Sequence, residues 1–255
     1  MAIKVYPNKI EASKAVANHI GGLIRERQKE NRQAVLGLAT GSSPIYIYEE
    51  LVRMHQEEGL SFANVVSFNL DEYYPMEPTA VQSYVKFMQQ HLFSHIDMPA
   101  QQIHIPDGRI AKEDIAAYCR DYDEKIQAVG GIDIQLLGIG RTGHIGFNEP
   151  PVGADSTTRL VALHELTIED AAKDFEGISA VPTHAITMGV STILAAKEII
   201  LVGWGNNKAS IVQRAIEGAM SDEIPASYLQ MNPKVVWVLD KEAAGELRKL
   251  KIEKI

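Results

Sequence analysis

Short runs of apolar residues alternate along the chain with segments whose apolar residues recur every three or four positions. The runs predict buried strands at 34–39, 65–70, 132–140, 198–205 and 234–240. The helical spacing is first seen in Ala12, Ala15, Val16, Ile20, Leu23 and Ile24. Because strands buried on both faces read as continuous apolar runs, we expect an α/β fold. It would be a doubly wound, mostly parallel, Rossmann-like sheet with helices on both faces, in one domain over residues 1–255.

This alternation is interrupted between about residues 150 and 183. The stretch is rich in Pro, Gly, Ser, Thr and charge, with a short apolar run at 160–163 and a helical pattern from Leu166 to Phe175. Two interpretations are open: a lid-like insertion that covers a site, and a surface connection with a small extra hairpin.

The charge balance argues against one class of partner. The chain has 25 Lys and Arg against 33 Asp and Glu, and nucleic-acid affinity comes mainly from neutralising phosphates, so we expect no nucleic acid. No apolar run approaches the roughly 18–20 residues of a membrane span, and no secretion leader is evident. We therefore expect a cytoplasmic protein without a membrane partner. The single Cys119 fits a reducing compartment, and we expect it to be packed in a helix.

Ligands of open α/β sheets bind beyond the carboxyl ends of the strands. Four segments follow predicted strands: ATGSSP at 39–44, NLDEYY at 69–74, GIGRTGHIGFNEPP at 138–151 and WGNNK at 204–208. We expect the functional residues in these four segments.

The first and last segments favour an anion site. Ser42 and Ser43 precede Pro44 and a helical pattern, and free N–H groups at a helix start suit a sugar phosphate; a plain Ser N-cap is the alternative. Lys208 begins another predicted helix, where a cation opposes the helix dipole unless an anion is bound beside it. A solvated Lys208 is the alternative.

The second segment places Asp71 and Glu72 at the end of an apolar run. A partly desolvated carboxylate there gains basicity and can remove a proton next to a carbonyl. Adjacent acids are also common as solvated turn residues or helix N-caps.

The third segment matches the GxGxxG dinucleotide fingerprint at Gly138, Gly140 and Gly143. That fingerprint requires a helix after the third glycine, and the Pro150-Pro151 pair prevents one from continuing. The segment is better read as a flexible loop that carries His144 and Glu149, a proton shuttle and the carboxylate that orients it. No second His or Cys lies nearby at metal-ligand spacing, so we expect no metal.

Together the four segments resemble the glucosamine-6-phosphate deaminase/isomerase family, whose superfamily includes 6-phosphogluconolactonases. The resemblance covers nearly the whole chain and is most specific in GHIGFNEP and NLDEY. It implies that Asp71 moves a proton between C2 and C1, that His144 opens the sugar ring and that Glu149 orients His144. No metal or organic cofactor is implied.

The resemblance also implies a phosphorylated amino sugar as the small-molecule partner, with either gluco or galacto configuration. An oligomer is possible, since family members range from monomers to hexamers. The implied substrate-binding residues are Thr40, Gly41, Ser42, Ser43, Glu72, Gly140, Thr142 and Lys208.

Three other functions fit the sequence less well. A 6-phosphogluconolactonase would use the same phosphate site but needs no base such as Asp71. A non-catalytic sugar-phosphate sensor would be expected to carry a DNA-binding segment before the strand at residues 3–6. An NAD oxidoreductase is disfavoured by the Pro150-Pro151 pair.

Two departures from the family pattern lie near the expected site. Many members have an Asp where this chain has Thr142, which can form hydrogen bonds but carries no charge. Some relatives use an Arg for phosphate on the segment after residue 150, and Lys173 is only a loose match without the guanidinium fork.

A third departure generates a prediction about regulation. Regulated members bind N-acetylglucosamine 6-phosphate with Ser residues after the catalytic Glu and with two basic residues further on. This chain has Pro151, Val152 and Gly153 there, followed by Arg159 and Val161. We expect that ligand to leave the substrate saturation curve unchanged; a clear shift of the curve would contradict this.

Overall fold

A single parallel sheet forms the centre of the computed structural model, which describes residues 1–248 and 253–254. The strand order is β11-β1-β10-β9-β6-β2-β3-β5, and every neighbouring pair is parallel. The strands are β1 (Ala2–Tyr6), β2 (Ala34–Leu38), β3 (Val65–Asn69), β5 (Ile103–His104), β6 (Ile134–Leu137), β9 (Glu198–Gly203), β10 (Val235–Asp240) and β11 (Glu253–Lys254). The predicted parallel α/β fold is confirmed.

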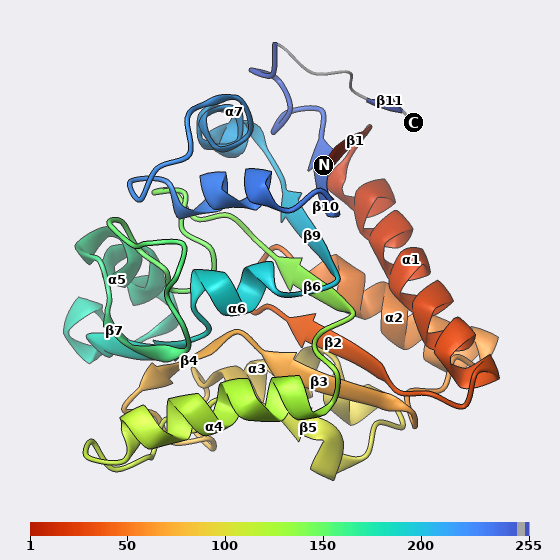
Figure 1. Cartoon of the computed structure of the whole chain (residues 1–255), viewed down its shortest axis with the longest axis horizontal. Helices are drawn as coiled ribbons and strands as arrows, with labels where there is room; N and C mark the ends of the chain where they lie inside the picture. Colours follow the sequence, from red (N-terminus) through yellow and green to blue (C-terminus); the bar gives the residue numbers. More distant parts are fainter. Residues whose placement is uncertain (249–252, 255) are drawn as a thin grey trace.

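Helices cover both faces of this sheet (Figure 1). One face carries α1 (Lys9–Lys29), α2 (Ile45–Glu58) and α3 (Tyr84–His91), and the other carries α4 (Ile115–Ala128), α6 (Val190–Leu194) and α7 (Ala209–Glu217). The predicted apolar stripe of α1 is buried at Ala12, Val16, Ile20 and Ile24, because residues four apart share one side of a helix. Cys119 is buried in α4, as expected.

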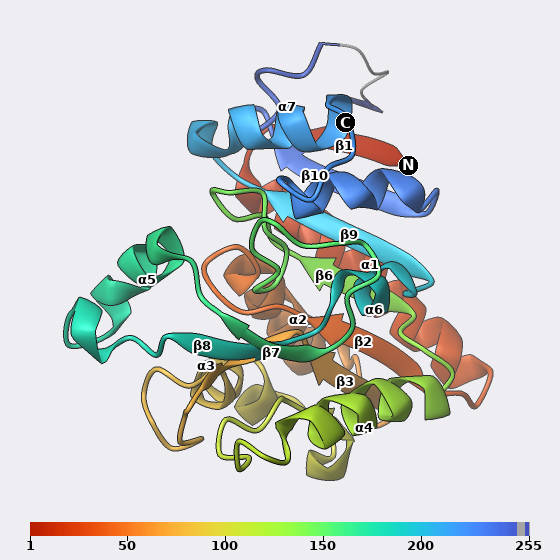
Figure 2. The same ribbon diagram turned by 60° about the vertical axis from the view of Figure 1, so that its left-hand side comes forward.

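A second, smaller sheet was not predicted. It has the order β4-β8-β7 and is antiparallel, with β4 (Asp71–Tyr74), β8 (His184–Thr187) and β7 (Arg159–Ala162). β7 and β8 form a hairpin whose tip contains α5 (Glu165–Ala171), and the tip projects from the main body (Figure 2). The stretch 150–183 therefore contributes the first strand and the tip of a small hairpin, which was one of its two interpretations, and β8 follows directly after it. Its action as a lid stays a prediction.

The strand order reverses beside β2. The chain runs from β2 to β3 on one side, and β6 pairs with β2 on its other side before the chain continues to β9 and β10. Such a reversal opens a crevice at the carboxyl ends of the two strands. The segments 39–44 and 138–151 both emerge there. No helix within the described residues is long and apolar enough to cross a bilayer.

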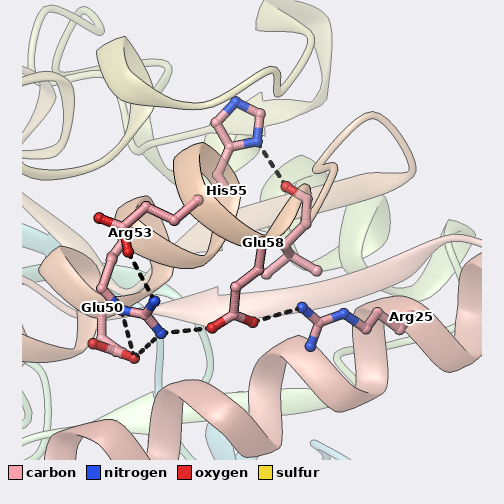
Figure 3. A network of polar contacts seen from close by, with 7 residues as sticks. Arg25, Glu50, Arg53, His55 and Glu58 are labelled. Atoms are coloured by element: carbon pink, nitrogen blue, oxygen red, sulfur yellow. Dashed lines mark hydrogen bonds and ion pairs between the residues drawn. The ribbon is translucent and has the colours of Figure 1, made fainter.

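Ion pairs link α1 to α2 on the surface (Figure 3). Arg53 lies between Glu50 and Glu58, at 2.6 and 2.7 Å, and Glu58 also pairs with Arg25 of α1 at 3.0 Å. Beneath them Leu51 is fully buried between the same helices. Exposed ion pairs contribute little because water and salt screen them, so buried apolar contacts hold this interface.

Two substitutions compare these contributions. We expect Leu51→Ala to lower the free energy of unfolding by about 2–5 kcal/mol, since it leaves a cavity in the core. Arg25→Gln, which removes the exposed pair with Glu58, should have a much smaller effect. That effect should disappear in 1 M salt, because the Debye length falls to about 3 Å. Urea unfolding at low and high salt measures both. An effect of Arg25→Gln as large as that of Leu51→Ala would contradict this view.

Candidate functional site

A cavity of about 170 Å³ lies at the reversal point of the sheet. It is lined by Ala39, Thr40, Gly41, Ser42, Ser43, Leu70, Asp71, Tyr84, Gly138, Ile139, Gly140, His144, Gly146 and Phe147. Seven of the predicted site residues are among them, and they come from three of the four predicted segments. A wider surface hollow of about 630 Å³ between residues 74–82 and 175–182 contains none of the predicted site residues.

The loop before α2 supplies the polar end of the cavity. Pro44 occupies the N-cap position and no side chain caps the helix, so the alternative of a Ser N-cap is wrong. Within the described residues, the backbone N–H groups of Gly41, Ser42 and Ser43 donate no hydrogen bond. These donors and the N-terminus of α2 form a site suited to an anion.

Asp71 is the buried carboxylate of the cavity. The residue is 5% exposed, and its carboxylate accepts no hydrogen bond from any described residue. Burial raises the pKa of Asp71 to about 8, and the neighbouring charge of Glu72 acts in the same direction. Gly146 leaves space beside it, since a Cβ at that position would lie 3.3 Å from Asp71 Oδ2. Asp71 is thus a basic carboxylate that faces the cavity.

Glu72 has a different environment from its neighbour. Its carboxylate accepts hydrogen bonds from the backbone N–H groups of Tyr73, Tyr84 and Val85, and so holds the start of α3. Burial raises the pKa of Glu72 to about 7, although these hydrogen bonds oppose the rise. Neither acid is a solvated turn residue. Glu72 does not line the cavity, and its predicted contact with substrate stays untested; it fixes Tyr84, which does line the cavity.

His144, Glu149 and Thr142 form a compact triangle behind the cavity. His144 Nδ1 lies 2.9 Å from both Glu149 Oε2 and Thr142 Oγ1, and the Thr142 hydroxyl donates to Glu149 Oε2 at 3.0 Å. A hydroxyl has one proton, so Thr142 must accept from Nδ1–H, and Nε2 is left as the basic nitrogen. Burial acts to raise the pKa of Glu149, but the hydrogen bond from His144 keeps that pKa below its usual value.

Gly140 allows the imidazole to pack against the loop backbone. A Cβ at residue 140 would lie 2.1 Å from His144 Nε2, which no side chain could tolerate. Gly143 has φ +83°, in the left-handed region that favours glycine. No helix follows Gly143. The glycines therefore serve the histidine and a tight turn, and the dinucleotide interpretation is wrong.

Lys208 lies at the N-cap position of α7, as predicted, outside the cavity lining. Burial lowers its pKa, while the charges of Asp170 and Arg141 act on it in opposite directions. Asp170 belongs to α5 and forms an ion pair with Arg141 at 2.8 Å. Lys173 is exposed and forms no ion pair or side-chain hydrogen bond within the described part of the chain. The charges of Lys208, Arg141 and Asp170 thus act on one another.

Sequence reasoning missed several residues of this site. Tyr84 lines the cavity, Thr167 of α5 donates a short hydrogen bond to Glu149 Oε1, and Arg141 pairs with α5. Arg141 lies inside the segment GIGRTGHIGFNEPP and could have been found from the sequence. Tyr84 and Thr167 give no local sequence signal. No cluster of His, Cys, Asp or Glu that could hold a metal ion occurs in residues 1–248.

Comparison with known proteins identifies related sequences over most of the chain. The family described as glucosamine-6-phosphate isomerases/6-phosphogluconolactonase matches residues 7–237. A putative glucosamine-6-phosphate deaminase-like protein of Bacteroides thetaiotaomicron is 46% identical over 96% of this chain, which spans 37% of that protein's length. The glucosamine-6-phosphate deaminase of Bacillus velezensis is 47% identical over 88% of this chain and 92% of its own.

Solved structures agree with these matches. A monomeric glucosamine-6-phosphate deaminase superposes with a TM-score of 0.92 at 41% identity, covering 96% of this chain and all of the other. The 6-phosphogluconolactonase of Trypanosoma brucei has a TM-score of 0.78 at 19% identity, covering 97% and 98%, which shows a shared fold. With residues 7–237 matched and relatives above 40% identity, the chain belongs to the family of glucosamine-6-phosphate isomerases and 6-phosphogluconolactonases.

Proposed function

We propose that this chain is an enzyme that converts glucosamine 6-phosphate and water to fructose 6-phosphate and ammonia. The observation that carries the proposal is the cavity itself, in which Asp71, His144 and the anion-binding loop at 41–43 meet. The relatives named glucosamine-6-phosphate deaminase support the choice of substrate. The phosphate would bind the free N–H groups before α2, with Lys208 nearby.

Ring opening is the first chemical step of the proposal. The basic Nε2 of His144 takes the proton of the C1 hydroxyl and delivers a proton to the ring oxygen, giving the open aldehyde. Glu149 fixes the tautomer and stabilises the imidazolium that forms between the two transfers. Thr142 replaces the family's acid in this arrangement, and its hydroxyl connects His144 to Glu149 without adding a second charge.

Proton transfer by Asp71 is the second step. The carboxylate removes the C2 proton next to the aldehyde and returns a proton to C1, while a proton passes from the amino group to O1, so that the aldose becomes a ketose imine. Water then adds at C2 and ammonia leaves, giving fructose 6-phosphate. The raised pKa of Asp71 makes the carboxylate a stronger base than an ordinary Asp.

An ammonia-release assay on glucosamine 6-phosphate and galactosamine 6-phosphate in parallel tests the proposed substrate. We expect turnover of the gluco isomer. Hydrolysis of 6-phosphogluconolactone without ammonia release from either amino sugar would replace this proposal with a lactonase.

Asp71→Asn tests the proposed base. The amide cannot accept the C2 proton, so we expect ammonia release to be lost while substrate binding by calorimetry changes little. In the unmodified protein kcat/KM should rise with pH up to about 8, because below its raised pKa the carboxyl is protonated and inactive as a base. Near-normal turnover by Asp71→Asn would remove Asp71 from this role.

Thr142→Val tests the connection between His144 and Glu149. The methyl group keeps the volume but removes the hydrogen bonds, so we expect kcat on the cyclic sugar to fall by about tenfold, a typical effect of losing one hydrogen bond to a charged group. Thr142→Ser should retain most of the activity. Equal activity of the Val and Ser variants would show that the hydroxyl has no part in ring opening.

A further inference from the structure

Arg141 belongs to the 138–151 loop, which forms one wall of the cavity. It directly follows Gly140, which lines the cavity, and it precedes the His144 triangle. Its Nη1 is held 2.8 Å from Asp170 Oδ1 of α5, and both side chains are about half exposed. None of its other guanidinium donors has a hydrogen-bond partner within the described residues. The guanidinium therefore keeps free donors beside the site.

The three loops at this end of the sheet converge on Ser43. A Cβ at Gly138 would lie 3.4 Å from Ser43 Oγ, and Trp204 Nε1 donates to the carbonyl oxygen of Ser43 at 2.9 Å. Arg141 lies three residues beyond the first contact and Lys208 four residues beyond the second. The two cations thus belong to the two segments that contact Ser43, and the charge of Arg141 acts on Lys208.

We propose that Arg141 is a phosphate ligand of this site and that Asp170 competes with the phosphate for its guanidinium. This inference rests on the proposed function, since it concerns the phosphate of the same substrate. A phosphate monoester carries close to two negative charges at neutral pH, and the planar fork of Arg can bind two of its oxygens at once. Lys208 alone supplies one charge and no fork. Arg141 supplies both from the loop that carries His144.

The ion pair with Asp170 also admits a second interpretation, in which Arg141 merely tethers α5 to the loop. On the face of α5 that carries Asp170, Thr167 three residues earlier contacts Glu149. The two interpretations differ in what the loss of Asp170 does. If the pair is a tether, loss of Arg141 and loss of Asp170 have the same effect. If Arg141 binds phosphate, loss of Asp170 frees its guanidinium for the phosphate.

The experiment compares Arg141→Ala, Arg141→Lys and Asp170→Ala with Arg25→Ala. Arg25 is a matched control, because its ion pair with Glu58 is 3.0 Å long, about 40% exposed and at the far end of α2. We expect Arg141→Ala to raise KM for glucosamine 6-phosphate, and the dissociation constant of inorganic phosphate measured by calorimetry, by about tenfold or more. Arg141→Lys should recover part of this loss. Asp170→Ala should bind phosphate at least as tightly as the unmodified protein.

Two results would overturn the inference. One is phosphate binding by Arg141→Ala within twofold of the Arg25→Ala control. The other is an Asp170→Ala variant that weakens phosphate binding as much as Arg141→Ala, which would make the pair a tether. The phosphate titration needs no turnover, so it tests Arg141 even if the protein releases no ammonia. The absence of ammonia release from the unmodified protein would instead overturn the proposed function.

Discussion

Removal of the Asp71 carboxylate from water is the constraint on which the rest of the site depends. A charged carboxylate without hydrogen-bond donors is costly to bury, and the same cost makes it basic. The surrounding segments preserve this state by not supplying a donor to it. The 138–151 loop passes with Gly146 next to the carboxylate, and the neighbouring acid turns to the opposite side. A side chain that donated a hydrogen bond to Asp71 would stabilise the folded protein. It would also lower the pKa of Asp71 and so make the carboxylate a weaker base.

His144 is treated in the opposite way. Its Nδ1 is engaged by Glu149 and Thr142, while Gly140 allows its ring to lie against the backbone. Asp71 is thus kept basic by the absence of hydrogen-bond donors, whereas His144 is oriented by its contacts with Glu149 and Thr142. Titratable groups with such different surroundings can act separately within one cavity. The segment that carries α5 contacts this arrangement at Glu149 through Thr167, and so connects the β7–β8 hairpin to the proposed proton shuttle.

Hydrophobic patterning was sufficient to predict the parallel sheet and the loops at its carboxyl ends, because buried parallel strands leave continuous apolar runs. The sequence also indicated that His144 and Glu149 act together, since only four residues separate them. The small sheet was not predicted, because β4 has only four residues, two of them acidic, and pairs with β8 more than 100 residues later in the chain. The different surroundings of Asp71 and Glu72 follow from that pairing. Contacts such as Thr167 with Glu149 depend on the packing of α5, which no local pattern encodes.

The pairing of β4 with β8 has a consequence for how this segment can vary. Asp71 lies opposite Thr187 and Glu72 opposite Ile186, and successive side chains of a strand point to opposite faces. Inserting or deleting one residue before Asp71 would exchange the two acids, placing the base under α3 and the helix anchor in the cavity. The adjacent carboxylates are therefore not interchangeable copies. Among homologues, this stretch should accept changes of residue type far more readily than changes of length.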